Sequence, residues 1–311
     1  MDNPRVNTSP RYLNYNQALR KQFDQRVQKI AVNAGFTCPN RDGSKGFGGC
    51  TYCNNQTFSP GYSHCSKTVR QQLTDGTRFF HHKYQEQYYL AYFQSYTNTY
   101  DTTENLRLLY EEALSYPQVK GLVIGTRPDC VDNELLDYLS RLAKQHYIMI
   151  EYGIESTDNA TLALINRGHD FACAERAVRE TAERGLFVSA HIILGLPKES
   201  RETILSHTKH LSALPLTALK IHQLQIIKGT TMAQQYLDHP EWFHLFEADE
   251  YIELCIDFLE RLHPSIAVER FVSQSPVRLR LAPDWGLKNF EFTAKIEKRL
   301  QERDTWQGRL F

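Results

Sequence analysis

The chain has 311 residues, of which 41% are hydrophobic and 23% are charged, a composition typical of a globular protein with a large core. Basic and acidic residues balance at 36 each, so the net charge of zero gives no overall signature of nucleic-acid or membrane binding. The first residues contain no apolar signal segment, and no apolar run approaches the roughly 18 residues that span a bilayer. We therefore expect a cytoplasmic protein without membrane partners, whose seven cysteines are ligands, catalysts or core residues.

Apolar runs typical of buried strands alternate with helical segments in the first part of the chain. Strands are predicted at residues 28–34, 88–94, 121–125, 147–153, 186–193 and 218–227. Helices are predicted at residues 103–115, 132–144, 170–184 and 199–212, where Asp132 and Asp170 are candidate N-caps and Gly185 a candidate stop signal. This order predicts an α/β fold, namely a partial (β/α)6 TIM-like barrel of parallel strands with N-terminal and helical C-terminal extensions.

The last part of the chain reads as mostly helical, notably at residues 247–262 and 287–303, with an irregular or short-strand segment at 268–284. We expect residues 1–230 to form the barrel with its N-terminal extension, and residues 231–311 to pack on it. Basic residues gather in this part, either as a local RNA-binding face or as an ordinary solvated surface: Arg270, Arg278, Arg280, Lys288, Lys295, Lys298 and Arg299.

A group of cysteines follows the first predicted strand. Eleven residues separate Cys38 from Cys50, and two separate Cys50 from Cys53. Thiolates at this spacing can bind one soft metal centre, and glycines at 43, 46, 48 and 49 let the backbone wrap closely around it. Three thiolates suit a four-iron cluster with one open iron, whereas structural zinc normally needs four protein ligands. Cys65 could supply a fourth ligand, so a zinc site stays an alternative.

Further motifs lie at the carboxyl ends of the predicted strands, where active sites of parallel barrels occur. They are Thr126-Arg127-Pro128-Asp129, Glu151-Tyr152-Gly153-Ile154-Glu155-Ser156 and Asn166-Arg167-Gly168-His169. Together with the cysteines they resemble the radical S-adenosylmethionine superfamily, in particular the subgroup of the elongator catalytic subunit and the YhcC and YtqA-type proteins. The usual C-x3-C-x2-C spacing is lengthened here in its first interval.

The resemblance implies that Cys38, Cys50 and Cys53 hold a [4Fe-4S] cluster and that neighbouring motifs bind S-adenosylmethionine. It places Tyr52 and Gly195 near the adenine, and Gln94 and Ser95 near the methionine amino group, where a carboxylate is usual. The remaining implied cofactor contacts are Arg127, Glu155, Ser156, Arg167 and His191. Glu151, a buried acid ending an apolar strand, is costly unless paired, which favours a site role. Lys220 and His222, two apart on one strand, are the candidate catalytic residues in contact with substrate.

The implied reaction is reductive cleavage of S-adenosylmethionine to a 5′-deoxyadenosyl radical, which abstracts hydrogen from a substrate. The same resemblance suggests a modified wobble uridine of transfer RNA as substrate, and an electron donor such as flavodoxin or ferredoxin as partner. Two alternatives stay open at this point: a radical enzyme acting on a small molecule, and a non-catalytic iron–sulfur or zinc protein serving electron transfer or RNA binding.

Overall fold

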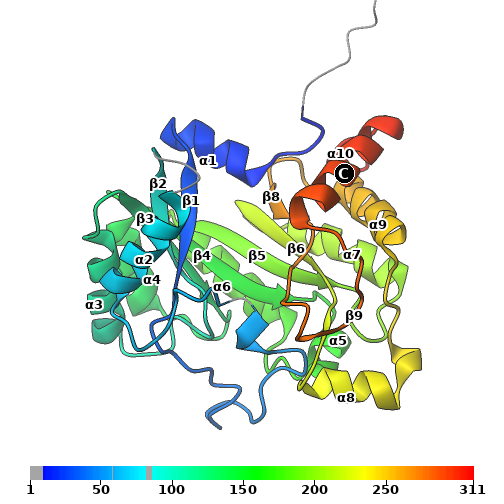
Figure 1. Cartoon of the computed structure of the whole chain (residues 1–311), viewed down its shortest axis with the longest axis horizontal. Coiled ribbons are helices and arrows are strands. Elements are labelled where there is room, and N and C mark those ends of the chain that lie inside the picture. Colours follow the sequence, from blue (N-terminus) through cyan, green and yellow to red (C-terminus); the bar gives the residue numbers. More distant parts are fainter. Residues whose placement is uncertain (1–9, 58, 82–85) are drawn as a thin grey trace, which may run out of the picture.

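The computed structural model describes residues 10–57, 59–81 and 86–311. Its centre is a parallel sheet in the order β1-β2-β3-β4-β5-β6-β8, curled into a half-barrel whose edge strands β1 and β8 are not paired with each other (Figure 1). The strands are β1 (Val27–Val32), β2 (Tyr88–Phe93), β3 (Val119–Thr126), β4 (Tyr147–Glu155), β5 (Phe187–Leu194), β6 (Ala218–Gln223) and β8 (Ala267–Arg270). The predicted α/β partial barrel is therefore confirmed.

Helices cover the outer face of this sheet and bury most of the core against it. They are α2 (Val69–His81), α3 (Thr103–Leu114), α4 (Asn133–Leu142), α5 (Asn159–Leu164), α6 (Phe171–Glu183) and α7 (Arg201–Ser212). The carboxylates of Asp132 and Asp170 cap α4 and α6 by accepting from backbone N–H groups, as predicted. Gly185, with φ of +74°, follows the end of α6 in the left-handed conformation that stops a helix.

The C-terminal part contributes more to the sheet than expected. The seventh parallel strand, β8, comes from this part, so the predicted count of six strands is one too low. A strand of four residues carries too little periodicity to be recognised. The predicted strand at 218–227 also divides, because β7 (Ile226–Ile227) leaves the sheet and pairs antiparallel with β9 (Arg280–Ala282).

Three further helices complete the C-terminal part, α8 (Thr231–Asp238), α9 (Ala248–Arg261) and α10 (Asn289–Glu302), together with a short 3-10 turn, η2 (Pro240–Trp242). Another 3-10 turn, η1 (Asn55–Thr57), lies between β1 and α2. Helix α9 packs between α7 and α10. The Gln307 amide then donates to the carbonyls of His263 and Ile266, each at 2.8 Å, and its oxygen accepts from the N–H of Leu13. Within the described residues, no helix is long and apolar enough to cross a bilayer.

The inner face of the sheet changes character along the strands. Near the amino ends it is apolar, with Leu90, Val123 and Met149 packed under Tyr15 and Leu19 of α1 (Tyr15–Phe23). Figure 1 shows α1 across this end of the sheet and the segment that carries the cysteines at the opposite end. Because the carboxyl ends of all parallel strands meet at that opposite end, the polar side chains of several strands converge there.

Candidate active site

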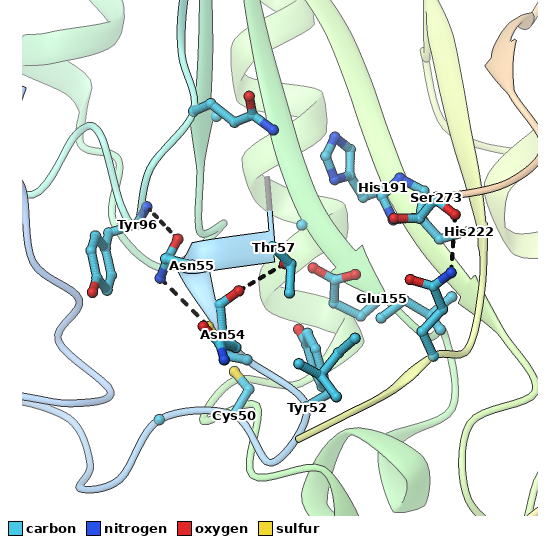
Figure 2. A pocket seen from close by; sticks show the side chains of 18 of the residues that line it. Cys50, Tyr52, Asn54, Asn55, Thr57, Tyr96, Glu155, His191, His222 and Ser273 are labelled. Atoms are coloured by element: carbon cyan, nitrogen blue, oxygen red, sulfur yellow. Dashed lines mark hydrogen bonds between the residues drawn. The ribbon is translucent and has the colours of Figure 1, made fainter. Parts of the chain in front are cut away.

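A cavity of about 240 Å³ lies at the carboxyl ends of the strands. The predicted site residues that line it are Cys38, Cys50, Tyr52, Cys53, Gln94, Arg127, Glu151, Glu155, Arg167, His191 and His222. Figure 2 shows Cys50 and Tyr52 at one end, His191, His222 and Ser273 at the other, and Glu155 between them. We call these the cysteine end and the strand end, the latter formed by β5, β6, β8 and the segment 271–275.

The cysteine loop is shaped by its own backbone hydrogen bonds. The N–H of Cys53 donates to the carbonyl of Cys50 at 3.0 Å, and the N–H of Gly49 donates to Asn40 at 2.8 Å. Gly49 has φ of +79°, and a Cβ there would approach the Arg41 side chain at 2.9 Å. The glycine therefore lets the loop turn back over Arg41, which brings the two halves of the loop together.

The Asn-Arg-Gly motif fastens this loop to the barrel. The Asn166 amide donates to the carbonyl of Gly49 at 2.8 Å, and the Asn40 amide donates to the carbonyl of Asn166 at 2.6 Å. The N–H of Thr51 donates to Ile165 at 3.0 Å. Asn40 and Asn166 were not among the predicted site residues. A short polar motif with a left-handed asparagine, here at φ of +53°, was the available signal.

Nitrogen donors lie next to two of the three cysteine sulfurs. Cys50 Sγ lies 3.5 Å from Arg167 Nη1 and 3.6 Å from Asn40 Nδ2, and Cys53 Sγ lies 3.7 Å from Asn55 Nδ2. Burial and the neighbouring Cys50 raise the pKa of the Cys53 thiol. The bare thiolate is therefore disfavoured there, and hydrogen bonds to a ligating sulfur are what iron–sulfur sites use to tune their clusters. The donor set fits an iron–sulfur cluster.

The cysteines line one cavity without forming a compact site for a single ion. Among the described residues, no three His, Cys, Asp or Glu side chains gather closely enough to hold one metal ion. A four-iron cube is wider than a single ion, so its thiolates stand further apart. Cys65 is exposed and does not line the cavity. Its Cβ faces Gly35, where an added Cβ would lie 3.6 Å from it. The structure therefore does not bring Cys65 to the other three cysteines.

Two buried arginines stand beside the cysteines. Arg167 Nη2 donates to the carbonyl of Gly153 at 2.5 Å and lies 4.0 Å from the carboxylate of Glu155. A Cβ on Gly153 would approach Glu155 Oε1 at 2.5 Å, so only glycine leaves room for this pair. Arg127 directs Nε and Nη2 to Asp129 at 2.9 and 3.0 Å, while its Nη1 is buried without a partner. One unsatisfied guanidinium nitrogen at the cavity is suited to a carboxylate.

Four predicted residues do not line the cavity. The Ser156 hydroxyl donates to Glu199 at 2.7 Å, and the Ser95 hydroxyl lies 3.4 Å from that of Ser59. A Cβ on Gly195 would meet the Phe246 ring at 2.9 Å, so this glycine makes room for Phe246 rather than for a cavity ligand. Lys220 lies beneath the lining, fully buried on the inner face of β6.

Lys220 belongs to a layer of paired charges between the apolar layer and the cavity. Its Nζ lies 2.6 Å from Glu151 and 3.4 Å from Glu269, and Lys29 Nζ lies 2.7 Å from Glu269 and 3.4 Å from Glu151. The Tyr92 hydroxyl also donates to Glu151. We call these five residues the charged layer. Lys29, Tyr92 and Glu269 were missed; charged residues inside short apolar strands were the signal for two of them.

The charges in this layer hold one another ionised. Burial opposes ionisation of Glu151, but Lys220, Lys29 and a hydrogen bond from His191 outweigh it and keep the pKa of Glu151 well below its usual value. Burial lowers the pKa of Lys220 to about 8, against the attraction of Glu151 and Glu269. His191 Nε2, in the cavity wall, lies 2.7 Å from Glu151 Oε1. The layer is thus a fixed polar floor under the cavity.

Comparison with known proteins agrees with this geometry. The sequence matches the model of the Radical SAM superfamily over residues 35–211 and that of the Radical_SAM C-terminal domain over residues 216–302. YtqA of Bacillus subtilis is 36% identical over 308 residues, covering 99% of this chain and 95% of YtqA. YhcC of Escherichia coli is 33% identical over 285 residues, covering 91% of this chain and 90% of YhcC.

Two more distant matches are partial. The tRNA uridine(34) acetyltransferase of Methanocaldococcus infernus is 29% identical over 120 residues, covering 37% of this chain and 22% of that enzyme. The solved structure of Methanocaldococcus infernus Elp3 lacking residues 1–46 is 17% identical, with a TM-score of 0.68 over 90% of this chain. This chain spans only 64% of that structure, and the likeness shows a shared fold.

Proposed function

The chain belongs to the Radical SAM superfamily, and we propose that it is an enzyme that cleaves S-adenosylmethionine reductively at a [4Fe-4S] cluster held by Cys38, Cys50 and Cys53. We propose further that the resulting 5′-deoxyadenosyl radical abstracts hydrogen from a modified wobble uridine of transfer RNA. A reducing partner such as flavodoxin or ferredoxin would supply the electron.

One observation carries the proposal. Three cysteines from one glycine-rich loop line the same cavity as a buried arginine and a carboxylate, and nitrogen donors point at two of the sulfurs. When bound, the cluster and S-adenosylmethionine supply the electron transfer and the radical chemistry. Donors to sulfur favour the thiolate form, which is the form that ligates iron.

The chain's own residues bind and orient S-adenosylmethionine in the cavity. Tyr52, between the last two cysteines, presents an aromatic ring to the cavity suited to stacking on a purine. The unsatisfied Nη1 of Arg127 and the nearby Arg167 can hold the methionine carboxylate, while Glu155 and Gln94 offer oxygens to its ammonium group. The charged layer lies beneath the cavity and separates it from the apolar layer at the other end of the sheet.

The transfer RNA part of the proposal draws on a partial match. A stretch of 120 residues resembles an enzyme whose name gives uridine 34 of transfer RNA as its target, and the fold is shared with Elp3. The acetyl transfer in that name is not carried over, because this chain spans only 22% of that enzyme.

Anaerobic reconstitution with iron and sulfide tests the radical part. Reduced protein incubated with S-adenosylmethionine is expected to form 5′-deoxyadenosine, detected by mass spectrometry, and omission of the reductant is expected to abolish it. Absence of 5′-deoxyadenosine from protein with a full iron complement would contradict the radical function and favour a non-catalytic iron–sulfur protein.

The RNA part has its own test. Nucleosides from total transfer RNA of a deletion strain are compared with those of its parent and of a complemented strain. We expect one modified uridine to accumulate in the deletion strain and to disappear on complementation. An identical nucleoside profile in all three strains would contradict a transfer RNA substrate and favour a small-molecule substrate.

A further inference from the structure

The loop that carries the cysteines presents an exposed aromatic ring on its outer side. Within the interval between Cys38 and Cys50, residues 42–48 do not line the cavity, and we call them the loop tip. Phe47 in this tip is 79% exposed, the largest exposed fraction among the large apolar side chains of the described residues. Single exposed apolar side chains are common on protein surfaces. What distinguishes Phe47 is how its ring is held and what lies behind it.

The loop tip is a small hairpin that fixes this ring. Asp42 and Phe47 form an antiparallel bridge, and the N–H of Gly43 donates to the carbonyl of Gly46 at 3.1 Å. Gly43 has φ of +91°, and a Cβ there would approach the Phe47 ring at 2.8 Å, so glycine lets the ring lie against the backbone. The N–H of Gly46 also donates to the carbonyl of Pro39 at 3.2 Å. The exposed ring is therefore held by the backbone of its own loop rather than by a core.

The loop tip is closely connected to one of the cysteines. Phe47 and Cys50 are three residues apart, so their Cα atoms lie within about 11 Å of each other. The Asn166 amide donates to the carbonyls of Phe47 at 3.4 Å and of Gly49 at 2.8 Å. The Asn40 amide donates to the carbonyl of Asn166 at 2.6 Å and lies 3.6 Å from Cys50 Sγ. A continuous run of hydrogen bonds thus joins the exposed segment to a candidate ligand of the cluster.

A cluster in this cavity needs an electron from outside the molecule. The rate of electron transfer falls steeply with distance, so a carrier protein has to dock where the cluster comes close to the surface. The inner side of the cysteine loop faces the cavity, where S-adenosylmethionine and substrate would bind, whereas the loop tip lies outside the cavity lining. Figure 1 shows the segment that carries the cysteines projecting beyond the carboxyl ends of the strands. The loop tip therefore offers an approach to the cysteine end that the substrate does not occupy.

The charges around the ring suit a small protein contact better than a nucleic acid. The exposed cations at the loop tip are Arg41 and Lys45, against the single exposed carboxylate of Asp42. Lys45 already pairs with Asp129 at 2.9 Å. RNA binding draws its affinity from several phosphate contacts, and two cations, one of them paired, supply too few. Electron-transfer complexes have small interfaces, for which one apolar ring with a cationic edge is sufficient.

We propose that the loop tip, with Phe47 at its centre, is the docking surface for an acidic one-electron carrier of the flavodoxin type. The reduced flavin of the carrier loses one electron, the cluster gains it in passing from [4Fe-4S]²⁺ to [4Fe-4S]⁺, and no proton or bond is exchanged. The flat ring of Phe47 suits contact with the exposed edge of a flavin. This inference rests on the proposed function for the need of an electron, and it adds where that electron enters.

A binding titration tests the docking surface without turnover. Isotopically labelled recombinant bacterial flavodoxin is titrated with the reconstituted, oxidised protein, and its amide NMR shifts give Kd. Phe47→Ala is expected to raise Kd by about 10-fold, since an aromatic side chain at the centre of a small contact carries much of the affinity. Phe290→Ala is the matched control, because Phe290 is a ring of similar exposure, 68%, on α10, and it should leave Kd unchanged. An unchanged Kd in Phe47→Ala would overturn the proposal.

The source of the electron separates docking from chemistry. With reduced flavodoxin below saturation, Phe47→Ala should form 5′-deoxyadenosine about 10-fold more slowly than the unaltered protein at equal iron content. With dithionite, which needs no docking surface, the two proteins should form it at equal rates. Equal losses with both reductants would overturn the proposal, because Phe47 would then serve the cluster site itself. No product from the unaltered protein with dithionite would instead contradict the proposed function, and the titration would still test the docking surface.

Three further outcomes decide the chemistry of the contact. Phe47→Tyr, which keeps the ring and its contact with Gly43, should restore most of the flavodoxin-driven rate, and a rate as low as that of Phe47→Ala would overturn the role of the ring. Weaker binding of transfer RNA by Phe47→Ala, with flavodoxin binding intact, would overturn the proposal in favour of an RNA surface. A loss of rate with ferredoxin but not with flavodoxin would overturn the choice of carrier.

Discussion

The cysteine end and the strand end of the cavity treat their charged groups differently. At the cysteine end, Arg127 and Arg167 are engaged by Asp129, by backbone carbonyls and by a sulfur. At the strand end, Arg270 has no acidic partner among the described residues and His222 Nε2 has no acceptor. The first arrangement fixes the cysteine loop and leaves single nitrogens of Arg127 and Arg167 without a partner, whereas the second leaves a guanidinium without any ion pair among the described residues.

The largest effect is expected from removal of a cysteine, which tests the role assigned to the cysteine end. Cys50→Ala is expected to reduce the iron bound per chain and to bring 5′-deoxyadenosine formation to background, because the cluster loses one of three ligands. Iron analysis and mass spectrometry measure both.

Cys65→Ala is the matched control, since Cys65 is exposed and outside the cavity. It should retain both iron and activity. A loss of iron equal to that of Cys50→Ala would mean that Cys65 moves to ligate the metal, in contradiction to the three-cysteine assignment.

The charged layer between the two ends should respond in stability. Glu151→Gln leaves the buried Lys220 and Lys29 with one carboxylate between them, so the free energy of unfolding should fall by about 3–5 kcal/mol. Urea unfolding of the reconstituted protein gives this value. The double variant Glu151→Gln with Lys220→Met should recover part of the loss because it removes one uncompensated lysine. A double variant less stable than the single one would contradict the pairing.

Arg167 joins the cysteine end to the wall of the barrel. Arg167→Leu removes the donor to Cys50 and to the Gly153 carbonyl, and we expect 5′-deoxyadenosine formation to fall by about 10- to 100-fold. Rates are measured at matched iron content. An unchanged rate would show that this guanidinium serves folding only.

The smallest expected effect concerns the loop clamp. Asn166→Ala removes the hydrogen bond to Gly49 and places alanine at a positive φ, a cost of about 1–3 kcal/mol. The reconstituted variant should lose iron to a chelator faster than the unaltered protein. The control Asn105→Ala, at an exposed site on α3, should lose iron no faster than the unaltered protein. Equal rates of iron loss in both variants would contradict a role of Asn166 in holding the cysteine loop.

Long periodic segments of the sequence were enough to predict the barrel. Six apolar runs and capped helices such as α4 and α6 gave the order of elements, since parallel strands and amphipathic helices carry strong local patterns. Strand β8 begins the segment that was predicted to be irregular or a short strand, but its place in the barrel sheet was not predicted because its four residues, two of them charged, have no periodicity of their own. It is held by pairing with β6, a contact between residues about fifty positions apart.

The site residues, too, were predictable where their pattern is local and not where their partners are distant in the sequence. The cysteines and the Arg127 and Arg167 motifs were recognisable because their residue types and spacings are local. Lys29 and Glu269 were not, since each is ordinary in its own strand and gains its partner only when the sheet curls. Lys220 was predicted to share one strand face with His222 and to contact substrate, but its burial beside Glu151, below the cavity lining, depends on how far the strands extend.

The role of the cysteine end requires a cluster with one iron open to S-adenosylmethionine, and electron paramagnetic resonance tests this directly. The reduced, reconstituted protein should show a [4Fe-4S]⁺ spectrum that changes when S-adenosylmethionine is added, in the Cys65→Ala variant as well as in the unaltered chain. A spectrum unaffected by S-adenosylmethionine at saturating concentration would mean that no iron is open to it, and would contradict the account.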